Sequence, residues 1–196
     1  MNMKTLKAFI ALLAISFSGF ANAGLIEFEY TGTGSGTIGG QAFTDSFFTI
    51  TEYSNTDDLQ SCSATCQYID AISTTITIDN VGVFDFVSGT RTFVTNGILG
   101  LSRAGQSGMD LYNVFNVGSY DLLTALDTVV DSVSFLQWNR SPSVNTSGGK
   151  LVFNNGDTTG TFQARFNSPA TVTEPTTLAI FAFGLLGLAA SRFKKA

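Results

Sequence analysis

The 196-residue chain contains no histidine, and this absence excludes several kinds of active site. Histidine is the most frequent general base and metal ligand near neutral pH, so Ser–His and Cys–His nucleophile systems are excluded. The chain also has only two cysteines, Cys62 and Cys66, and a zinc site would need two further ligands. We accordingly expect no catalytic residue, no metal and no cofactor.

Basic residues are scarce in the body of the chain. Between Gly24 and Thr173 there are five of them against fourteen aspartates and glutamates, which gives this stretch a net charge of −9. Nucleic acids and anionic lipid surfaces repel such a protein at contact distance. We therefore expect no nucleic-acid partner.

The N-terminus has the pattern of an export signal. Two lysines among the first seven residues form a positive n-region, and residues 8–17 form an apolar h-region. Ala21 and Ala23 supply the small-x-small pattern that a signal peptidase requires. We predict a signal peptide over residues 1–23, cleaved so that Gly24 becomes the first mature residue.

An exported chain meets an oxidising compartment, where two nearby thiols pair. Cys62 and Cys66 lie four residues apart in the polar stretch SCSATC, and we predict a disulfide between them. Closing so small a loop contributes about 2 kcal/mol by the loop-length relation. The bridge should therefore pin a local turn rather than hold the whole fold.

The body has the residue pattern of a β protein. Short runs rich in Thr, Val, Ile and Phe cover residues 25–31, 46–53, 73–79, 82–86, 90–95, 111–115, 133–138, 150–155 and 160–166. In the first run, Ile26, Phe28 and Tyr30 alternate with polar residues, as a half-buried strand requires. Nine or ten strands at this spacing predict an all-β fold, a single jelly-roll-like β-sandwich over residues 24–170.

Turn residues separate these runs. Asn96-Gly97 and residues 155–157 (Asn-Gly-Asp) tolerate positive φ angles, and we predict a hairpin turn at each. One segment, 119–133, is ambiguous. Leu122, Leu126 and Val129 follow helical spacing, so the segment is either a helix or two strands with a turn near Asp127.

Two short motifs resemble functional signatures without their context. Gly34-Ser-Gly36-Thr-Ile-Gly39 matches half of a dinucleotide-binding motif, but the residues after it predict turn and strand in place of a helix. Ser147-Gly-Gly-Lys150 has the spacing of a Ser–Lys nucleophile pair, but two glycines and a strand predict that the side chains do not share a helical face. We interpret the first as a glycine-rich hairpin and the second as a loop entering a strand.

Trp138 is the only tryptophan and is followed by Asn139 and Arg140. An exposed indole beside amide and guanidinium donors would suit a sugar ring, so Trp138 is a candidate sugar contact. The alternative is that Trp138 continues the alternation of Val133 and Phe135 and ends in the core.

The C-terminal tail resembles a membrane segment of marginal length. Residues 176–191 would span about 24 Å as a helix, short of the roughly 30 Å core of a bilayer. Arg192, Lys194 and Lys195 would stop translocation and hold that end in the cytoplasm, which leaves Glu174-Pro175 just outside the inner membrane. We predict a transmembrane helix over residues 176–191.

An acidic-proline signature, a short Leu/Ala/Gly-rich helix and a basic end together resemble the PEP-CTERM sorting signal of Gram-negative bacteria. The matching residues, besides the basic end, are Val172, Glu174, Pro175, Leu178, Gly184, Leu185, Gly187, Leu188 and Ala189. Thr173 stands where the family usually has its first proline. The resemblance implies that residues 171–196 are recognised, and cut, by an exosortase-type membrane protease.

The resemblance also implies a route and a destination. Such proteins pass the inner membrane, are transiently anchored in it, and are associated with exopolysaccharide and biofilm matrix at the cell surface. We expect a non-enzymatic protein with a structural or adhesive role there. One rival is a carbohydrate-binding module with an exposed aromatic such as Trp138 or Tyr112; another is a polysaccharide-active enzyme that uses a carboxylate pair.

Overall fold

The structure, a computed structural model, describes residues 24–105, 109–130 and 133–166. Within these ranges, thirteen strands form two antiparallel sheets, and the only helical element is the 3-10 turn η1 (Thr56–Asp58). The predicted all-β sandwich is confirmed. No helix in the described ranges has the length and apolar character needed to cross a bilayer. The predicted transmembrane helix lies outside them.

The first sheet contains the longest strands of the molecule. Its order is β10 (Leu126–Val130), β13 (Gly149–Phe166), β1 (Leu25–Ile38), β2 (Gln41–Asn55), β5 (Ser73–Ile78) and β6 (Gly82–Asp85), and β12 (Val144–Thr146) also pairs with β13. The pairing of β1 with β13 joins the two ends of the described chain, and Ile26 lies opposite Phe166.

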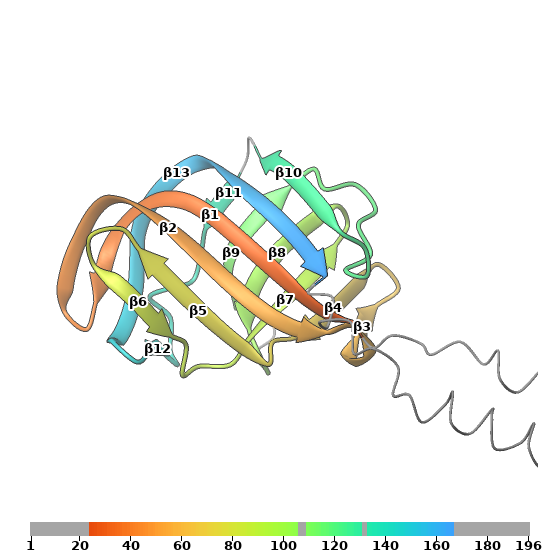
Figure 1. Cartoon of the computed structure of the whole chain (residues 1–196), viewed down its shortest axis with the longest axis horizontal. Helices are drawn as coiled ribbons and strands as arrows, with labels where there is room; N and C mark the ends of the chain where they lie inside the picture. Colours follow the sequence, from red (N-terminus) through yellow and green to blue (C-terminus); the bar gives the residue numbers. More distant parts are fainter. Residues whose placement is uncertain (1–23, 106–108, 131–132, 167–196) are drawn as a thin grey trace, which may run out of the picture.

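The second sheet packs across the inner face of the first. Its order is β11 (Val133–Phe135), β9 (Asp110–Phe115), β8 (Ile98–Arg103), β7 (Thr90–Thr95), β4 (Cys66–Asp70) and β3 (Gln60–Ser63). Figure 1 shows β13, β1 and β2 curving across the front, with β9, β8 and β7 behind them.

The period-two alternation of the sequence sets which side chains form the core. On β1, Ile26, Phe28 and Tyr30 are fully buried, whereas the residues between them are partly exposed. On β2 the same inward register carries Phe48 and Ile50 into the core. Because successive strand residues point to opposite faces, one face of each long strand meets the second sheet and the other meets solvent.

Two of the predicted turns have different outcomes. Asn96 and Gly97 have φ angles of 48° and 78° and join β7 to β8, as predicted. The turn predicted at residues 155–157 is wrong, because β13 runs without a break from Gly149 to Phe166. The extra residues are absorbed as bulges against β1, where the register shifts on either side of Gly34.

The glycine-rich stretch from Gly34 to Gly39 ends β1 and enters a hairpin turn, as expected. β1 and β2 are joined through Gly39 and Gly40, whose φ angles are 56° and 89°. The residues that follow form strand β2, so the local geometry lacks the helix N-terminus on which a dinucleotide-binding motif depends.

In the ambiguous segment, the described residues adopt strand and irregular structure, not helix. β10 begins at Leu126 and pairs with β13, so Asp127 lies inside a strand and the suggested turn there is wrong. Tyr120 is in the irregular part, where its hydroxyl donates to the backbone oxygen of Thr124 at 2.8 Å.

The core is built around aromatic rings from both sheets. Tyr112 of β9 crosses from the second sheet and meets Tyr30 edge-on, with ring centroids 5.9 Å apart. Its hydroxyl donates to the backbone oxygen of Thr31 at 3.0 Å. Gly160 makes room for this contact, because a Cβ there would lie 2.3 Å from the Thr31 oxygen and 2.5 Å from the Tyr112 hydroxyl.

Replacing Gly160 with alanine should therefore destabilise the fold. Backbone cannot yield as a side-chain tip does, so we expect the free energy of unfolding to fall by about 1–3 kcal/mol. Urea unfolding followed by tyrosine and tryptophan fluorescence measures it. Thr159→Ala, at the exposed neighbouring position, is the control, and equal stability of the two variants would contradict the close-contact argument.

Candidate functional site

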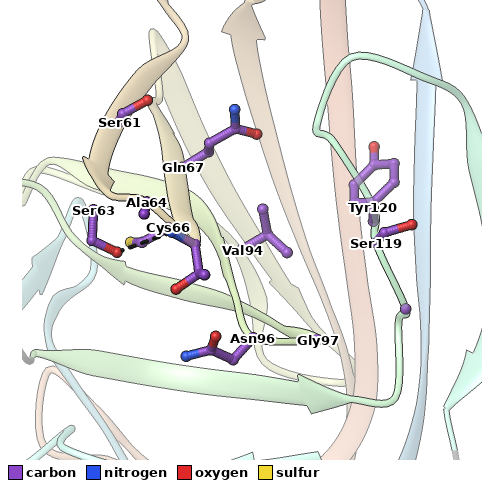
Figure 2. A pocket seen from close by; sticks show the side chains of 12 residues that line it. Ser61, Ser63, Ala64, Cys66, Gln67, Val94, Asn96, Gly97, Ser119 and Tyr120 are labelled. Carbon is purple, nitrogen blue, oxygen red and sulfur yellow. Dashed lines mark hydrogen bonds between the residues drawn. The ribbon is translucent and has the colours of Figure 1, made fainter.

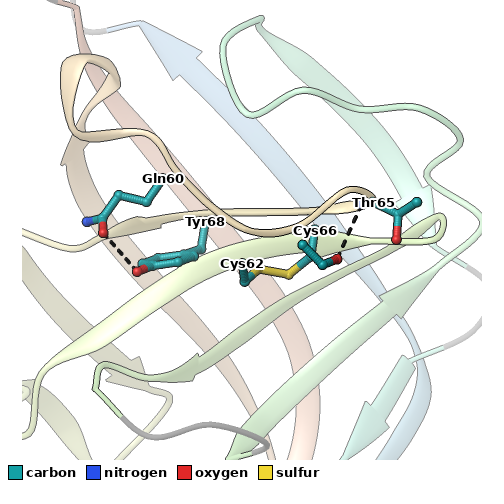
Figure 3. Close-up of a disulfide and its surroundings, with 6 residues drawn as sticks. Gln60, Cys62, Thr65, Cys66 and Tyr68 are labelled. Atoms are coloured by element: carbon teal, nitrogen blue, oxygen red, sulfur yellow. Dashed lines mark hydrogen bonds between the residues drawn. A yellow bond between two sulfur atoms is a disulfide. The ribbon is translucent and has the colours of Figure 1, made fainter.

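The predicted disulfide is present. Cys62 at the end of β3 and Cys66 at the start of β4 are bonded, with their Cα atoms 5.2 Å apart. Figure 3 shows the bridge closing the tip of this hairpin, with the Tyr68 hydroxyl donating to Gln60 Oε1 farther along at 2.8 Å. The hairpin forms the edge of the second sheet and is thereby held as a compact arm.

The hairpin tip is fixed against a neighbouring turn. The backbone N–H of Asn96 donates to the oxygen of Thr65 at 3.3 Å, which ties the β7–β8 turn to the disulfide loop. The N–H of Val117, in the segment after β9, donates to the oxygen of Gly97 at 3.2 Å. Three separate pieces of chain are thus joined through backbone bonds around one point.

A groove of about 400 Å³ lies among these three pieces (Figure 2). Six serine, threonine, glutamine and asparagine side chains line it: Ser61, Ser63, Thr65, Ser119, Gln67 and Asn96. Val94 is the main aliphatic side chain in the lining, and Tyr120 adds an aromatic ring. None of the described side chains that line the groove is charged. Sequence reasoning found the disulfide but not the groove, since its lining comes from three distant segments.

The charged side chains of β4 and β7, next to the groove, are paired with each other. Arg91 Nε lies 3.0 Å from Asp70 Oδ1, and the guanidinium carbon stands 4.2 Å from the Tyr68 ring centre. Asp70 and Arg91 face each other at the opposite end of the β4–β7 pairing from Cys66 and Thr95. This pair is not part of the groove lining, and the described lining is electrically neutral although the body carries a net negative charge.

A buried carboxyl group lies in the core, deeper than the groove. Glu52 is fully buried on β2, and Thr92 on β7 donates its hydroxyl to Glu52 Oε2 across the two sheets. The Tyr30 hydroxyl is 2.9 Å from Thr92 Oγ1, and the hydroxyls of Thr74 and Thr90 are 2.6 Å apart beside them. This set of side chains forms a polar link between the sheets.

Burial raises the pKa of Glu52 from 4.5 to about 7, and the Thr90, Thr92 and Thr74 hydroxyls partly oppose that effect. Burial also raises the pKa of Tyr30, and the nearby Glu52 carboxyl adds to this. Glu52 has no exposed surface, so it cannot reach an external substrate. Its position predicts an effect on stability rather than on catalysis.

Stability should fall as pH rises through the titration of Glu52. A folded-state pKa above the unfolded value means that the protonated form stabilises the fold, fully below pH 4.5 and progressively less up to about pH 7. The shift corresponds to about 3 kcal/mol. Glu52→Gln keeps the shape and cannot titrate, so it should remove this decrease and be more stable than the native chain at pH 8.

Chemical denaturation of both proteins at pH 5 and pH 8 measures the effect. Glu29→Gln, on the outward-facing side of β1, is the control and should keep the native pH dependence. A native protein whose stability is the same at the two pH values would refute the role of Glu52.

Of the two interpretations of Trp138, the structure supports the core, and the candidate sugar contact is wrong. Trp138 is fully buried, with its ring centre 4.9 Å from that of Phe153. The chain after β11 continues along β9, where Leu136 and Gln137 donate to backbone oxygens at 3.0 Å, and this turns the indole inward. Tyr112, the other aromatic considered for sugar contact, is also fully buried.

Arg103 helps to hold the segment that carries Trp138. Its Nη2 donates to the backbone oxygen of Gln137 at 2.5 Å, and Nη1 lies 3.7 Å from Met109 Sδ. The residue is 2% exposed, and burial lowers its pKa. Its guanidinium therefore serves packing rather than binding from solution.

Trp138→Ala should cost about 3–5 kcal/mol of folding free energy, because it leaves a large cavity against Phe153. Leu136→Ala, two residues earlier at a position 42% exposed, should change stability by less than about 1 kcal/mol. Thermal unfolding of the two variants distinguishes them. Equal melting temperatures would mean that Trp138 does not occupy the core.

The remaining motif residues take local structural roles. Ser147 lies in the turn between β12 and β13, where its Oγ accepts from the backbone N–H of Asp85 at 3.0 Å, and Lys150 is in β13. The predicted loop into a strand is confirmed. Among the residues of the three described ranges, no group of three or more acidic or cysteine side chains is arranged to hold a metal ion.

Most of the residues predicted to direct export and sorting lie outside the described ranges. Gly24, the predicted first mature residue, is described, and its N–H donates to Thr56 Oγ1 at 3.2 Å. Ala21 and Ala23 of the predicted signal peptide lie outside the described residues. So do the predicted sorting residues Val172, Thr173, Glu174 and Pro175 and the membrane-stop residues Arg192, Lys194 and Lys195.

Comparison with known protein families gives one match. Residues 171–195 match the model of the PEP-CTERM protein-sorting motif. Comparisons with curated proteins and with solved structures found no match to the chain. The motif marks an exported protein that is anchored transiently in the membrane and processed by an exosortase.

Proposed function

We propose that this chain is a non-enzymatic protein of the cell surface or extracellular matrix of a Gram-negative bacterium, with a structural or adhesive role in exopolysaccharide or biofilm. The observation that carries the proposal is the sorting motif at residues 171–195, joined to a separate all-β body. An exosortase would cut near Glu174-Pro175 and release the body outward.

The outer face of the first sheet supports a role in a hydrated matrix. The strand registers place four threonines side by side across four neighbouring strands: Thr161, Thr31, Thr49 and Thr77. The hydroxyls of Thr31 and Thr161 lie 2.5 Å apart. A face of closely spaced hydroxyls offers hydrogen bonds to water and to glycans.

Two observations favour a non-enzymatic role over the polysaccharide-active enzyme. The described lining of the groove contains no carboxylate, and glycoside hydrolysis needs a pair of them across the bound sugar. Glu52, whose carboxyl pKa is strongly raised, is sealed in the core. The two aromatic residues considered for the carbohydrate-binding alternative, Trp138 and Tyr112, are buried in the core and cannot stack on a sugar from solution.

The sorting route is tested by the mass of the mature protein. In a host with an exosortase, the extracellular form should begin at Gly24, end near Glu174 and lack the basic end. Pro175→Ala, and separately glutamine at Arg192, Lys194 and Lys195 together, should leave the protein in the membrane fraction. Pro169→Ala, outside the matched motif, should be released normally.

The destination is tested in the same strains by fractionating the biofilm. The processed protein should sediment with the extracellular polysaccharide and move to the soluble fraction when the polysaccharide is digested. Extracellular protein that still contains Phe193–Ala196 as the major form would contradict processing. Processed protein that never associates with polysaccharide would contradict the matrix role.

A further inference from the structure

The groove opens at the end of the sandwich, where the inner face of the second sheet runs out from under the first. Gln67 lies directly across from Val94. Asn96, in the turn after β7, lines the groove with them. Thr92, two residues before Val94 on β7, bonds Glu52 in the core. The groove therefore continues directly from the core at Val94, which belongs to both.

The lining combines polar side chains with an aliphatic base. Val94 is 7% exposed and packs with the core, so it forms the base of the groove. Gln67, Asn96 and Ser119 bring an amide or hydroxyl to the same space, and Figure 2 shows them around Val94. An amide offers both donors and an acceptor, as does the combination of several hydroxyls.

This combination matches the chemistry of a neutral sugar. A pyranose presents hydroxyls at its edge, which need donors and acceptors, and C–H groups on its face, which pack on apolar side chains. A charged ligand would find no counter-charge in the described lining and would meet the net negative charge of the body if it were acidic. The volume of about 400 Å³ lies within the range of small-molecule sites.

The groove is also held in shape before any ligand binds. The Cys62–Cys66 bridge restrains one wall, and the backbone bond from Asn96 to Thr65 fixes the opposite turn to it. Asn96 and Gly97 have the positive φ angles of a tight hairpin turn. Little ordering entropy would be lost on binding, which favours affinity in a small site.

We propose that this groove binds a neutral saccharide segment, with Gln67, Asn96 and Ser119 hydrogen-bonding its hydroxyls and Val94 contacting its C–H face. The inference rests on the proposed matrix function for the source of the saccharide, an extracellular polysaccharide. It differs from the earlier carbohydrate-binding hypothesis because the ligand is held by amides and hydroxyls at the sandwich end, not by a stacked Trp138.

The test is titration calorimetry of the full chain in lauryldimethylamine oxide micelles, a detergent without a sugar headgroup. The ligands are maltotriose, cellotriose, mannotriose and N,N′,N″-triacetylchitotriose, with trimannuronate as the acidic comparison. At least one neutral trisaccharide should bind with a dissociation constant of about 1 mM or below. Trimannuronate should not bind.

Two variants locate the binding. Asn96→Gly removes the amide and keeps the positive φ, so it should weaken binding about three- to tenfold. Asn80→Gly is its matched control, because Asn80 is also exposed with a φ of 62° but lies in the β5–β6 turn away from the groove. Ser119→Trp fills the groove and should abolish binding. Val87→Trp is its control, because Val87 is 73% exposed and precedes β7, at the opposite end of that strand from Asn96.

The inference is overturned if none of the neutral trisaccharides binds at about 10 mM, ten times the expected dissociation constant. It is also overturned if trimannuronate binds as well as the neutral trisaccharides, or if Asn96→Gly and Ser119→Trp bind these ligands like their control variants. Failure of the proposed function has a different signature. If groove variants alter trisaccharide binding but the native protein does not associate with biofilm polysaccharide, the groove stands and the matrix role fails. If the native protein associates with the polysaccharide and no trisaccharide binds, the matrix role stands and the groove inference fails.

Discussion

The pairing of the first strand with the last is the constraint on which the sandwich depends. β1 lies between β2 and β13, and its register with β13 runs from Ile26 opposite Phe166 to Ile38 opposite Leu151. Every other described strand lies between these two in the sequence, so the central pairing of the first sheet has the longest loop to close. The first sheet cannot be completed until β13, the last described strand, has been synthesised.

Strand alternation made much of this fold predictable, and its limits have physical causes. The buried positions of β1 could be predicted from the spacing of Ile26, Phe28 and Tyr30, because alternate residues of a half-buried strand point to the same face. The inward register of β2 equally places Glu52 inside, but a carboxylate there is acceptable only because threonines of three other strand positions surround it. That surrounding depends on the pairing of distant strands, which no local pattern contains.

The errors in the prediction share a related origin. Asn155-Gly156 has the chemistry of a turn, yet a long strand can absorb it as a bulge when its partner also carries glycines, as β1 does at Gly32 and Gly34. Trp138 has polar neighbours in sequence, but its direction is set by pairing with β9. The groove escaped notice for the same reason, since its walls meet only after three segments are bonded through Thr65 and Gly97.

The position of the two ends of the body gives the molecule a polarity relative to the membrane. Leu25 and Phe166 lie at one pole, and Figure 1 places the β3–β4 hairpin beside them, whereas the β1–β2 turn lies at the other pole. Nine residues, 167–175, separate Phe166 from the predicted membrane span; these ten Cα–Cα steps reach at most about 36 Å. The sorting motif is therefore attached to the body at the pole that carries the disulfide hairpin, and Gly39-Gly40 lies at the other pole.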